Sequence, residues 1–232
     1  MKIFKILILS ACFLLGYLPA HAGTHFISLG RDCQVAGRMI AFNLRNAAYP
    51  LDWMVSPHFN GVTQVIKDDF KYFLDPAFLE YKIENIENTY YHFTFNHFFP
   101  LVGQPVTKDV HIAGTVVPNY LDYLPAVQET QGRRITRLLN LLSSREKVVF
   151  IRTHASQQEV LTFVNMIKTK YPRLDFLLVV VNEKNGLSYS WSIPNVLNFD
   201  ASQRCGLADW WNDNEWQLIF QKIAIHLTCH QN

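Results

Sequence analysis

Three apolar stretches in the second half of the chain predict buried strands, at residues 147–152, 175–181 and 196–199. Amphipathic stretches with apolar residues at helical spacing alternate with them and predict helices, at residues 126–143, 156–171 and 213–227. Strands that lack a polar face and are separated by helices are typical of a parallel sheet covered on both sides. The pattern therefore predicts an α/β fold with three layers, in which a mostly parallel sheet carries helices on both faces.

The first half begins with a short apolar strand at residues 26–29, which ends in a turn at Gly30. A helix should follow, with Asp32 and Cys33 in its first turn and its end near Asn46. A second helix is predicted over residues 60–70.

An aromatic and β-branched stretch at residues 89–95 predicts a further strand. The region before it, residues 71–88, leaves open a turn of helix that starts at Pro76. The region after it, residues 100–118, is broken by glycines and prolines and predicts a long loop, of the kind that is usually functional or mobile.

The first 22 residues have the pattern of a secretory signal peptide. Lys2 and Lys5 precede an apolar stretch at residues 6–18, and small residues before Gly23 form a cleavage site. Cys12 leaves a lipoprotein signal as an alternative. We expect a periplasmic or secreted mature chain, residues 23–232, that forms one α/β domain. The apolar stretch is too short for a permanent span, so we expect no stable membrane insertion after the signal is removed.

Removing this signal also changes the charge balance, because it takes away two lysines and no acid. The whole chain has 21 basic and 19 acidic residues, so the mature chain is formally neutral. This balance gives no reason to expect a nucleic-acid partner.

The chain has no CxxC or HExxH spacing, so we expect no metal site and no cofactor.

Three cysteines remain in the mature chain: Cys33, Cys205 and Cys229. In an oxidising compartment we expect Cys205 to pair with Cys229, which leaves Cys33 as the odd thiol. A thiol at a helix start faces unpaired N–H groups and the positive end of the helix dipole, and both favour the thiolate. Cys33 is therefore the candidate nucleophile, with an inert buried cysteine as the alternative.

Ligands of a parallel sheet gather at the carboxyl ends of its strands. In this chain those ends carry Arg31, Asp32, Cys33, Arg152, Thr153, His154, Asn182, Glu183 and Asp200. A cysteine nucleophile also needs a base. His97 is the first choice, because it follows a predicted strand and borders the long loop. His154 is a rival, whereas we expect His92 to be packed inside the strand. Candidate acids to orient the base are Asp52, Asp200 and Asp209.

Four segments resemble a known family. They are residues 26–30 followed by Cys33, AYPLDWMVSP at 48–57, YYHFTFNHFFP at 90–100 and VVFIRTH at 148–154. Together they are similar to a bacterial family of unknown function that is catalogued as papain-like cysteine peptidases. The resemblance implies Cys33 as nucleophile, His97 as base and Asp52 as a structural or catalytic residue. It also implies an α+β papain-like fold, the alternative to the α/β fold.

The sequence therefore predicts an exported cysteine-dependent hydrolase or transferase, such as a peptidase or amidase, with a Cys-His site. One alternative is an enzyme similar to the SGNH esterases and acyltransferases, with cysteine in place of serine. Another is a non-catalytic binding protein on the same scaffold. The substrate, a small molecule or a peptide, cannot be identified from the sequence.

Overall fold

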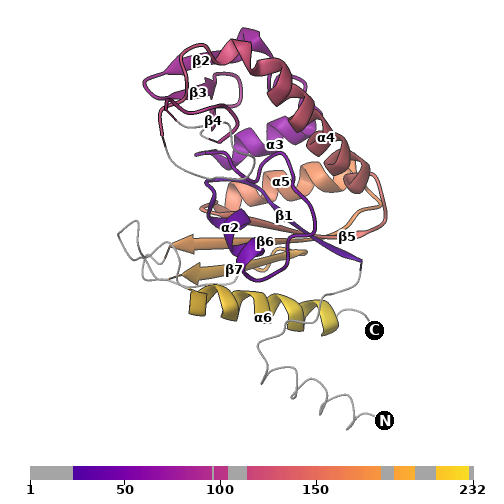
Figure 1. Ribbon diagram of the computed structural model, residues 1–232. Helices are drawn as coiled ribbons and strands as arrows, with labels where there is room; N and C mark the ends of the chain where they lie inside the picture. The colour runs from indigo at the N-terminus through magenta and orange to yellow at the C-terminus, as the bar shows by residue number, and fades with distance from the viewer. Residues whose placement is uncertain (1–22, 96, 104–113, 184–190, 202–212, 230–232) are drawn as a thin grey trace. The chain divides into compact units, whose positions relative to one another are not determined.

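The computed structural model describes residues 23–95, 97–103, 114–183, 191–201 and 213–229 (Figure 1). The predicted signal peptide lies outside these residues. The chain divides into two compact units, His25–Gln203 and a second that combines Met1–Thr24 with Arg204–Asn232. The described part of the second unit is Gly23, Thr24 and helix α6, Asp213–Cys229. As expected, α6 buries an apolar face: Trp216, Ile219, Phe220, Ile223 and Leu227.

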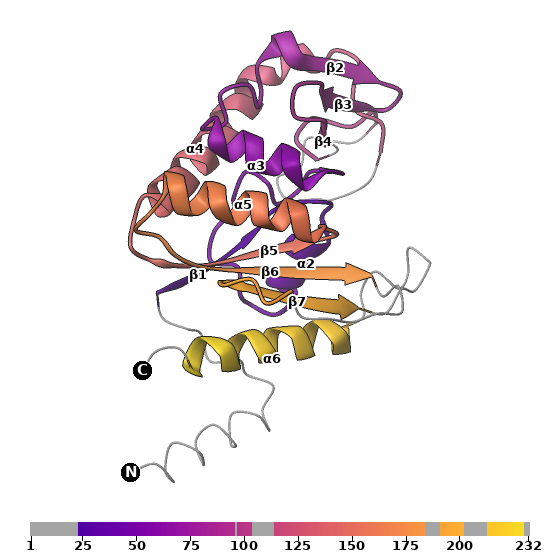
Figure 2. The same ribbon diagram turned by 180° about the vertical axis from the view of Figure 1, so that it is seen from behind.

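A four-stranded sheet in the order β1-β5-β6-β7 forms the base of the larger unit. Its strands are β1 (Thr24–Ser28), β5 (Lys147–Thr153), β6 (Asp175–Glu183) and β7 (Val196–Ala201). β5 pairs with β6 and β6 with β7 in parallel, and the arrowheads of β6 and β7 point the same way (Figure 2). The predicted α/β fold with a mostly parallel sheet is therefore confirmed.

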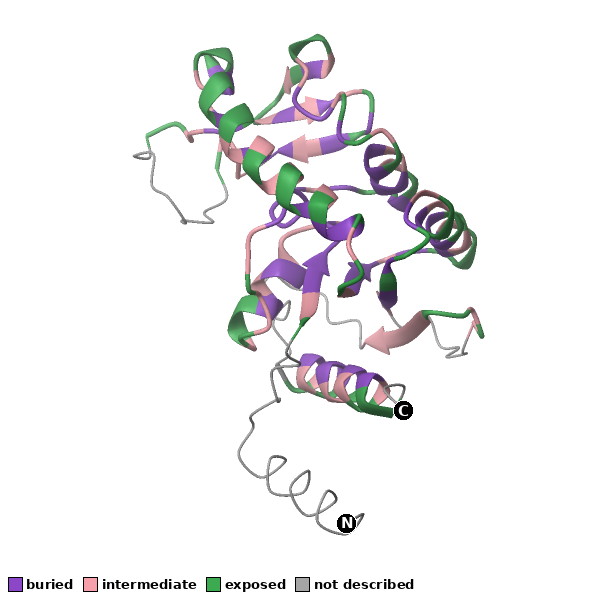
Figure 3. Cartoon of the chain, turned by 90° about the vertical axis from the view of Figure 1, so that its right-hand side faces the viewer, coloured by how far each residue is buried: buried purple, intermediate pink, exposed green. Residues whose placement is uncertain are grey.

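Helices α3 (Phe59–Lys67) and α5 (Gln157–Lys170) pack on this sheet in layers. The ring of Phe163 on α5 lies 5.6 Å from that of Phe150 on β5 and stacks on Phe59 of α3 at 4.9 Å. Buried residues concentrate in the strands and on the inward sides of these helices (Figure 3). The unit also contains α4 (Leu124–Leu142) and the short 3₁₀ turns η1 (Pro76–Phe78) and η2 (Tyr120–Asp122).

A second, antiparallel sheet was not predicted. It consists of β2 (Leu79–Lys82), β3 (Asn85–Asn88) and β4 (Phe93–Phe95), and it lies at the opposite end of the unit from β7 (Figure 1). The predicted strand at 89–95 shortens to β4, because the Asn88 side chain accepts the backbone N–H groups of Tyr90 and Tyr91 and holds a turn there.

Helix α2 (Gln34–Ala41) is shorter than predicted. The expected end near Asn46 is wrong, because Asn43 adopts a left-handed conformation (φ 54°) and the N–H of Leu44 turns back to the carbonyl of Met39. Asparagine tolerates this conformation better than most residues and often follows a helix end.

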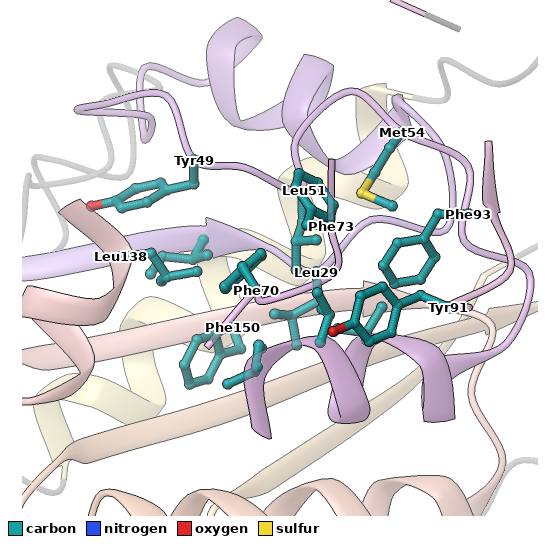
Figure 4. Close-up of a cluster of buried hydrophobic side chains, with 14 of the residues drawn as sticks. Leu29, Tyr49, Leu51, Met54, Phe70, Phe73, Tyr91, Phe93, Leu138 and Phe150 are labelled. Carbon is teal, nitrogen blue, oxygen red and sulfur yellow. The ribbon is translucent and has the colours of Figure 1, made fainter. Parts of the chain in front are cut away.

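The two sheets share one hydrophobic core. Leu29 follows β1, and Leu51 and Met54 come from the segment after α2. They meet Phe73, which precedes η1, and Phe93 of β4 (Figure 4). The end of β1 and the segment that leads to His97 are thus anchored in the same cluster.

Gly61 sets how closely α3 approaches β4. A Cβ atom at Gly61 would lie 2.5 Å from the Tyr91 carbonyl oxygen, whereas one at Gly132 on α4 would meet nothing within 4 Å. We therefore expect Gly61→Ala to lower the free energy of unfolding by about 2 kcal/mol, as overpacking does. Gly132→Ala should raise it by about 0.5–1 kcal/mol, as alanine favours a helix. Urea unfolding measures both, and a Gly61→Ala protein as stable as the wild type would contradict this packing.

Candidate active site

The turn that precedes Cys33 has a strained backbone. Gly30 and Arg31 both have positive φ angles, 75° and 82°. Glycine is needed at position 30, because a Cβ atom there would lie 2.8 Å from Ser56 Oγ. Arg31 has a Cβ atom in a region that disfavours one, at a cost of about 1–3 kcal/mol. Such strain persists only where surrounding contacts hold it.

Arg152 and Ser56 provide those contacts. Arg152 is fully buried and donates from Nη1 to Leu29 O (3.0 Å) and Ser56 Oγ (2.6 Å), and from Nη2 to Ser56 O (2.6 Å). Ser56 in turn holds Arg31: its Oγ accepts the Arg31 N–H (2.8 Å), and its own N–H donates to Arg31 O (3.1 Å). Burial and the nearby Arg31 charge lower the pKa of Arg152 to about 9, so it remains a cation at neutral pH. We call Arg31, Ser56 and Arg152 together the turn clamp.

Cys33 is the N-cap residue of α2 and is half-buried. Burial, then the Asp32 charge, raise the pKa of its thiol, and a backbone hydrogen bond only partly opposes them. The expected thiolate is therefore wrong for the resting protein. Asp32 explains part of the difference, because its Oδ1 accepts the Gln34 N–H (2.9 Å) and so occupies the helix start with a carboxylate.

His97 lies just after β4 and is half-buried. Its ring meets the ring of Trp53 edge-on, with centroids 6.3 Å apart. Burial lowers the pKa of His97, which leaves the imidazole neutral at neutral pH. A neutral imidazole is the form that can accept a proton.

Val55 and Ser56 connect the Cys33 turn to the strand that leads to His97. Val55 pairs with Thr94 of β4 through two backbone hydrogen bonds, N–H to O at 2.9 Å and 2.8 Å. The next residue, Ser56, is bonded to Arg31. Ser56 therefore holds the chain at Arg31, two positions before Cys33. Its neighbour Val55 holds the chain at Thr94, three positions before His97.

Asp52 is fully buried and forms an ion pair with Arg45 instead of contacting a histidine. Its Oδ2 accepts from Arg45 Nη2 (2.6 Å) and from the Tyr49 N–H (2.8 Å), and its Oδ1 has no partner among the described residues. Burial raises the pKa of Asp52, and Arg45 and the Tyr49 N–H oppose that rise. The Arg45 guanidinium lies 5.8 Å from the centre of the Trp53 ring, the same ring that His97 meets.

The other candidates lie elsewhere or serve the scaffold. His92 is exposed in the turn before β4 (φ 57°), so its expected packing inside a strand is wrong. His154 directly follows β5 with a positive φ (54°), and its N–H donates to Val181 O (3.0 Å). Asp200 on β7 pairs in register with Asn182, whose side chain brackets the backbone of Ala155. Asp209 lies outside the described residues.

The predicted disulfide is not supported. Cys229 is a free, exposed thiol at the end of α6, and Cys205 lies outside the described residues. Within the described ranges, no three His, Cys, Asp or Glu side chains gather closely enough to hold a metal ion. No helix of the described part of the chain is long and apolar enough to cross a membrane.

Ser56 was not among the residues predicted from the sequence. The only signal for it was its place in AYPLDWMVSP, one of the segments that carry the family resemblance. A serine between Val55 and Pro57 resembles ordinary loop sequence. Its role is to bond to both Arg31 and Arg152, and Arg152 is distant in the sequence. Arg152 was expected at the edge of the sheet, yet its side chain is buried beneath the Cys33 turn.

Replacing Asp32 with asparagine should lower the pKa of Cys33. Asparagine still offers an oxygen to the Gln34 N–H, but it lacks the charge that raises the thiol pKa. The pH midpoint of iodoacetamide alkylation at Cys33, measured by peptide mapping, should move to lower pH. The matched control Asp122→Asn removes an exposed charge and should leave the midpoint in place. An unchanged midpoint in Asp32→Asn would contradict this assignment.

Comparison with known proteins assigns the chain to a family. Residues 24–186 match the model of a family described as "putative papain-like cysteine peptidase (DUF1796)". An uncharacterized protein of Acanthamoeba polyphaga mimivirus is 25% identical over 206 residues, which cover 76% of this chain and 86% of the relative. No solved structure matches the chain significantly. The family match spans β1 to β6 and includes Cys33, Ser56, His97 and Arg152, so the chain belongs to the DUF1796 family.

Proposed function

We propose that the protein is a cysteine-dependent hydrolase or transferase in which Cys33 is the nucleophile and His97 the general base. The observation that carries this proposal is the shared support of the two residues. Val55 and Ser56 bond to β4 on one side and to the Cys33 turn on the other. Strained turns held in this way are concentrated at functional sites.

The resting pair is a neutral thiol and a neutral imidazole. The pKa of Cys33 is raised and that of His97 is lowered, and burial is the main cause of both shifts. In the reaction, Cys33 Sγ forms a bond with the substrate carbonyl carbon as His97 accepts the thiol proton. His97 then donates this proton to the leaving group, and water or another acceptor releases the acyl group from Cys33.

Asp52 supports His97 indirectly in this proposal. Its ion pair fixes Arg45, which lies over the Trp53 ring, and Trp53 meets the imidazole of His97. Because Asp52 touches neither the thiol nor the imidazole, we assign it a positioning role.

A second candidate function is ester or thioester chemistry of the SGNH type. The mostly parallel sheet, with the nucleophile directly after its first strand, favours it. Papain-like enzymes instead place the histidine on an antiparallel sheet, and here β4 is such a strand. Acyl probes of the ester and amide classes, compared on one preparation, distinguish the two functions by their relative rates.

The direct test of the Cys-His assignment uses p-nitrophenyl acetate as an acyl donor. The wild type should form an acetyl thioester at Cys33, seen by peptide mass, and Cys33→Ala should not. His97→Gln should slow acylation by about 100-fold or more, because general base catalysis contributes about that much. The matched control His92→Gln alters the exposed histidine five positions earlier and should acylate like the wild type.

Acylation at Cys33 that is equally fast in His97→Gln would remove His97 from the mechanism. A wild-type protein that forms no Cys33 adduct with any probe would instead favour the non-catalytic binding function.

We also propose that the chain is exported and cleaved before Gly23. The support is the pattern of residues 1–22, which lie outside the described structure. The intact mass of protein recovered from an exporting cell should correspond to a chain that starts at Gly23. A lipid adduct at Cys12 would support a lipoprotein instead, and an uncleaved chain would contradict export.

A further inference from the structure

Arg31 carries a charge that no hydrogen bond or ion pair with a described residue neutralises. Its side chain is half-buried and makes no hydrogen bond or ion pair with any residue that the structure describes. The positive charge of Arg31 contributes to lowering the pKa of Arg152, a second guanidinium. A partly desolvated cation beside another cation is unfavourable unless an anion joins them.

The carboxylates near this pair are already engaged. Asp32 accepts the Gln34 N–H at the start of α2. Glu159 accepts the Phe59 N–H with Oε1, and its Oε2 accepts from the N–H and Oγ of Ser156. These two acids cap helices α2, α3 and α5, and neither makes a hydrogen bond or ion pair with the Arg31 side chain.

The position of Arg31 in the turn is also costly. Its φ of 82° suits glycine, which would fill the position without strain. The Arg31 backbone bonds to Ser56, but any residue type could supply those two bonds. The side chain does not offset this cost with a hydrogen bond or ion pair to any described residue.

We propose that Arg31 is a substrate-recognition residue and that the substrate carries a carboxylate close to the bond that Cys33 attacks. The planar guanidinium can donate two parallel hydrogen bonds to a carboxylate. Arg31 lies two positions before Cys33 on the same clamped turn, so a bound carboxylate would fix the substrate relative to Sγ. This inference rests on the proposed function, because it assumes that Cys33 is the reacting group.

The test compares thiol reagents that differ only in charge. One pair is iodoacetate and iodoacetamide, and the other is 3-maleimidopropionic acid and N-ethylmaleimide, which places the carboxylate farther from the reacting carbon. Peptide mapping gives the rate at Cys33 alone. At one pH the ratio of the two rates in a pair does not depend on the thiolate fraction, because both reagents consume the same thiolate. The ratio therefore reports attraction of the anionic reagent and not a change in thiol pKa.

In at least one pair, Arg31→Gln should lower the acid-to-neutral ratio by about three- to tenfold at low ionic strength, the effect of one unit charge several ångströms away. High salt should shrink that difference. Arg31→Lys keeps the charge and should restore most of the ratio. The matched control Arg133→Gln removes a guanidinium from the exposed face of α4 and should leave the ratio unchanged.

Ratios that are the same in wild type and Arg31→Gln for both pairs would overturn the inference, as would an equal fall in Arg133→Gln. These outcomes are separate from failure of the proposed function, which shows as the absence of acyl transfer to Cys33. Alkylation needs no turnover, so a changed ratio without acylation would keep the anion site and reject the enzyme.

Discussion

The candidate site depends on one buried guanidinium. Arg152 reaches from β5 to the carbonyl of Leu29 and to both oxygens of Ser56, and it is fully buried. Removing one hydrogen-bond partner from such a buried set leaves a donor or acceptor unsatisfied, which costs about 1–3 kcal/mol. The turn clamp can therefore hold the unfavourable φ angle of Arg31.

The same clamp links the turn before Cys33 to the strand before His97, although 64 positions separate these two residues in the sequence. The parallel sheet supplies Cys33 through β1, and the antiparallel sheet supplies His97 through β4. Val55 and Ser56 join the two by backbone hydrogen bonds, and Leu29 and Phe93 lie in one core beneath them. In the proposed site, the nucleophile follows a strand of a mostly parallel sheet, as in an α/β hydrolase, and the base follows an antiparallel strand, as the resemblance to papain-like enzymes implies.

The parallel strands were predictable because β5 and β6 are apolar on both faces, and that pattern has few other interpretations. The β2–β3 hairpin was not, because KIENIEN is mostly polar and one of the two buried positions of β3 is an asparagine, Asn88. The turn before β4 depends on the Asn88 side chain, which no periodicity reveals. The fold class and the choice of Cys33 thus followed from local patterns.

Local patterns failed for the electrostatics of the site. A helix start favours a thiolate, but burial and Asp32 outweigh that effect at Cys33. Asp52 was a candidate for the acid that orients the base, yet its carboxylate forms an ion pair with Arg45. Both outcomes depend on how segments distant in the sequence pack together, which a single sequence does not report.

The most direct measurement of this account is the rate of Cys33 acylation by p-nitrophenyl acetate after Ser56→Ala. This change removes the hydroxyl that joins Arg152 to the Arg31 N–H and leaves the Ser56 backbone bonds in place. The comparison is Thr63→Ala, which removes a buried hydroxyl bonded to Phe59 O within α3, away from the clamp. Each should lower the free energy of unfolding by about 1–3 kcal/mol. We predict that only Ser56→Ala slows acylation, by about tenfold or more, because misplacing a reacting group is costly. A folded Ser56→Ala protein that acylates at the wild-type rate would contradict the account.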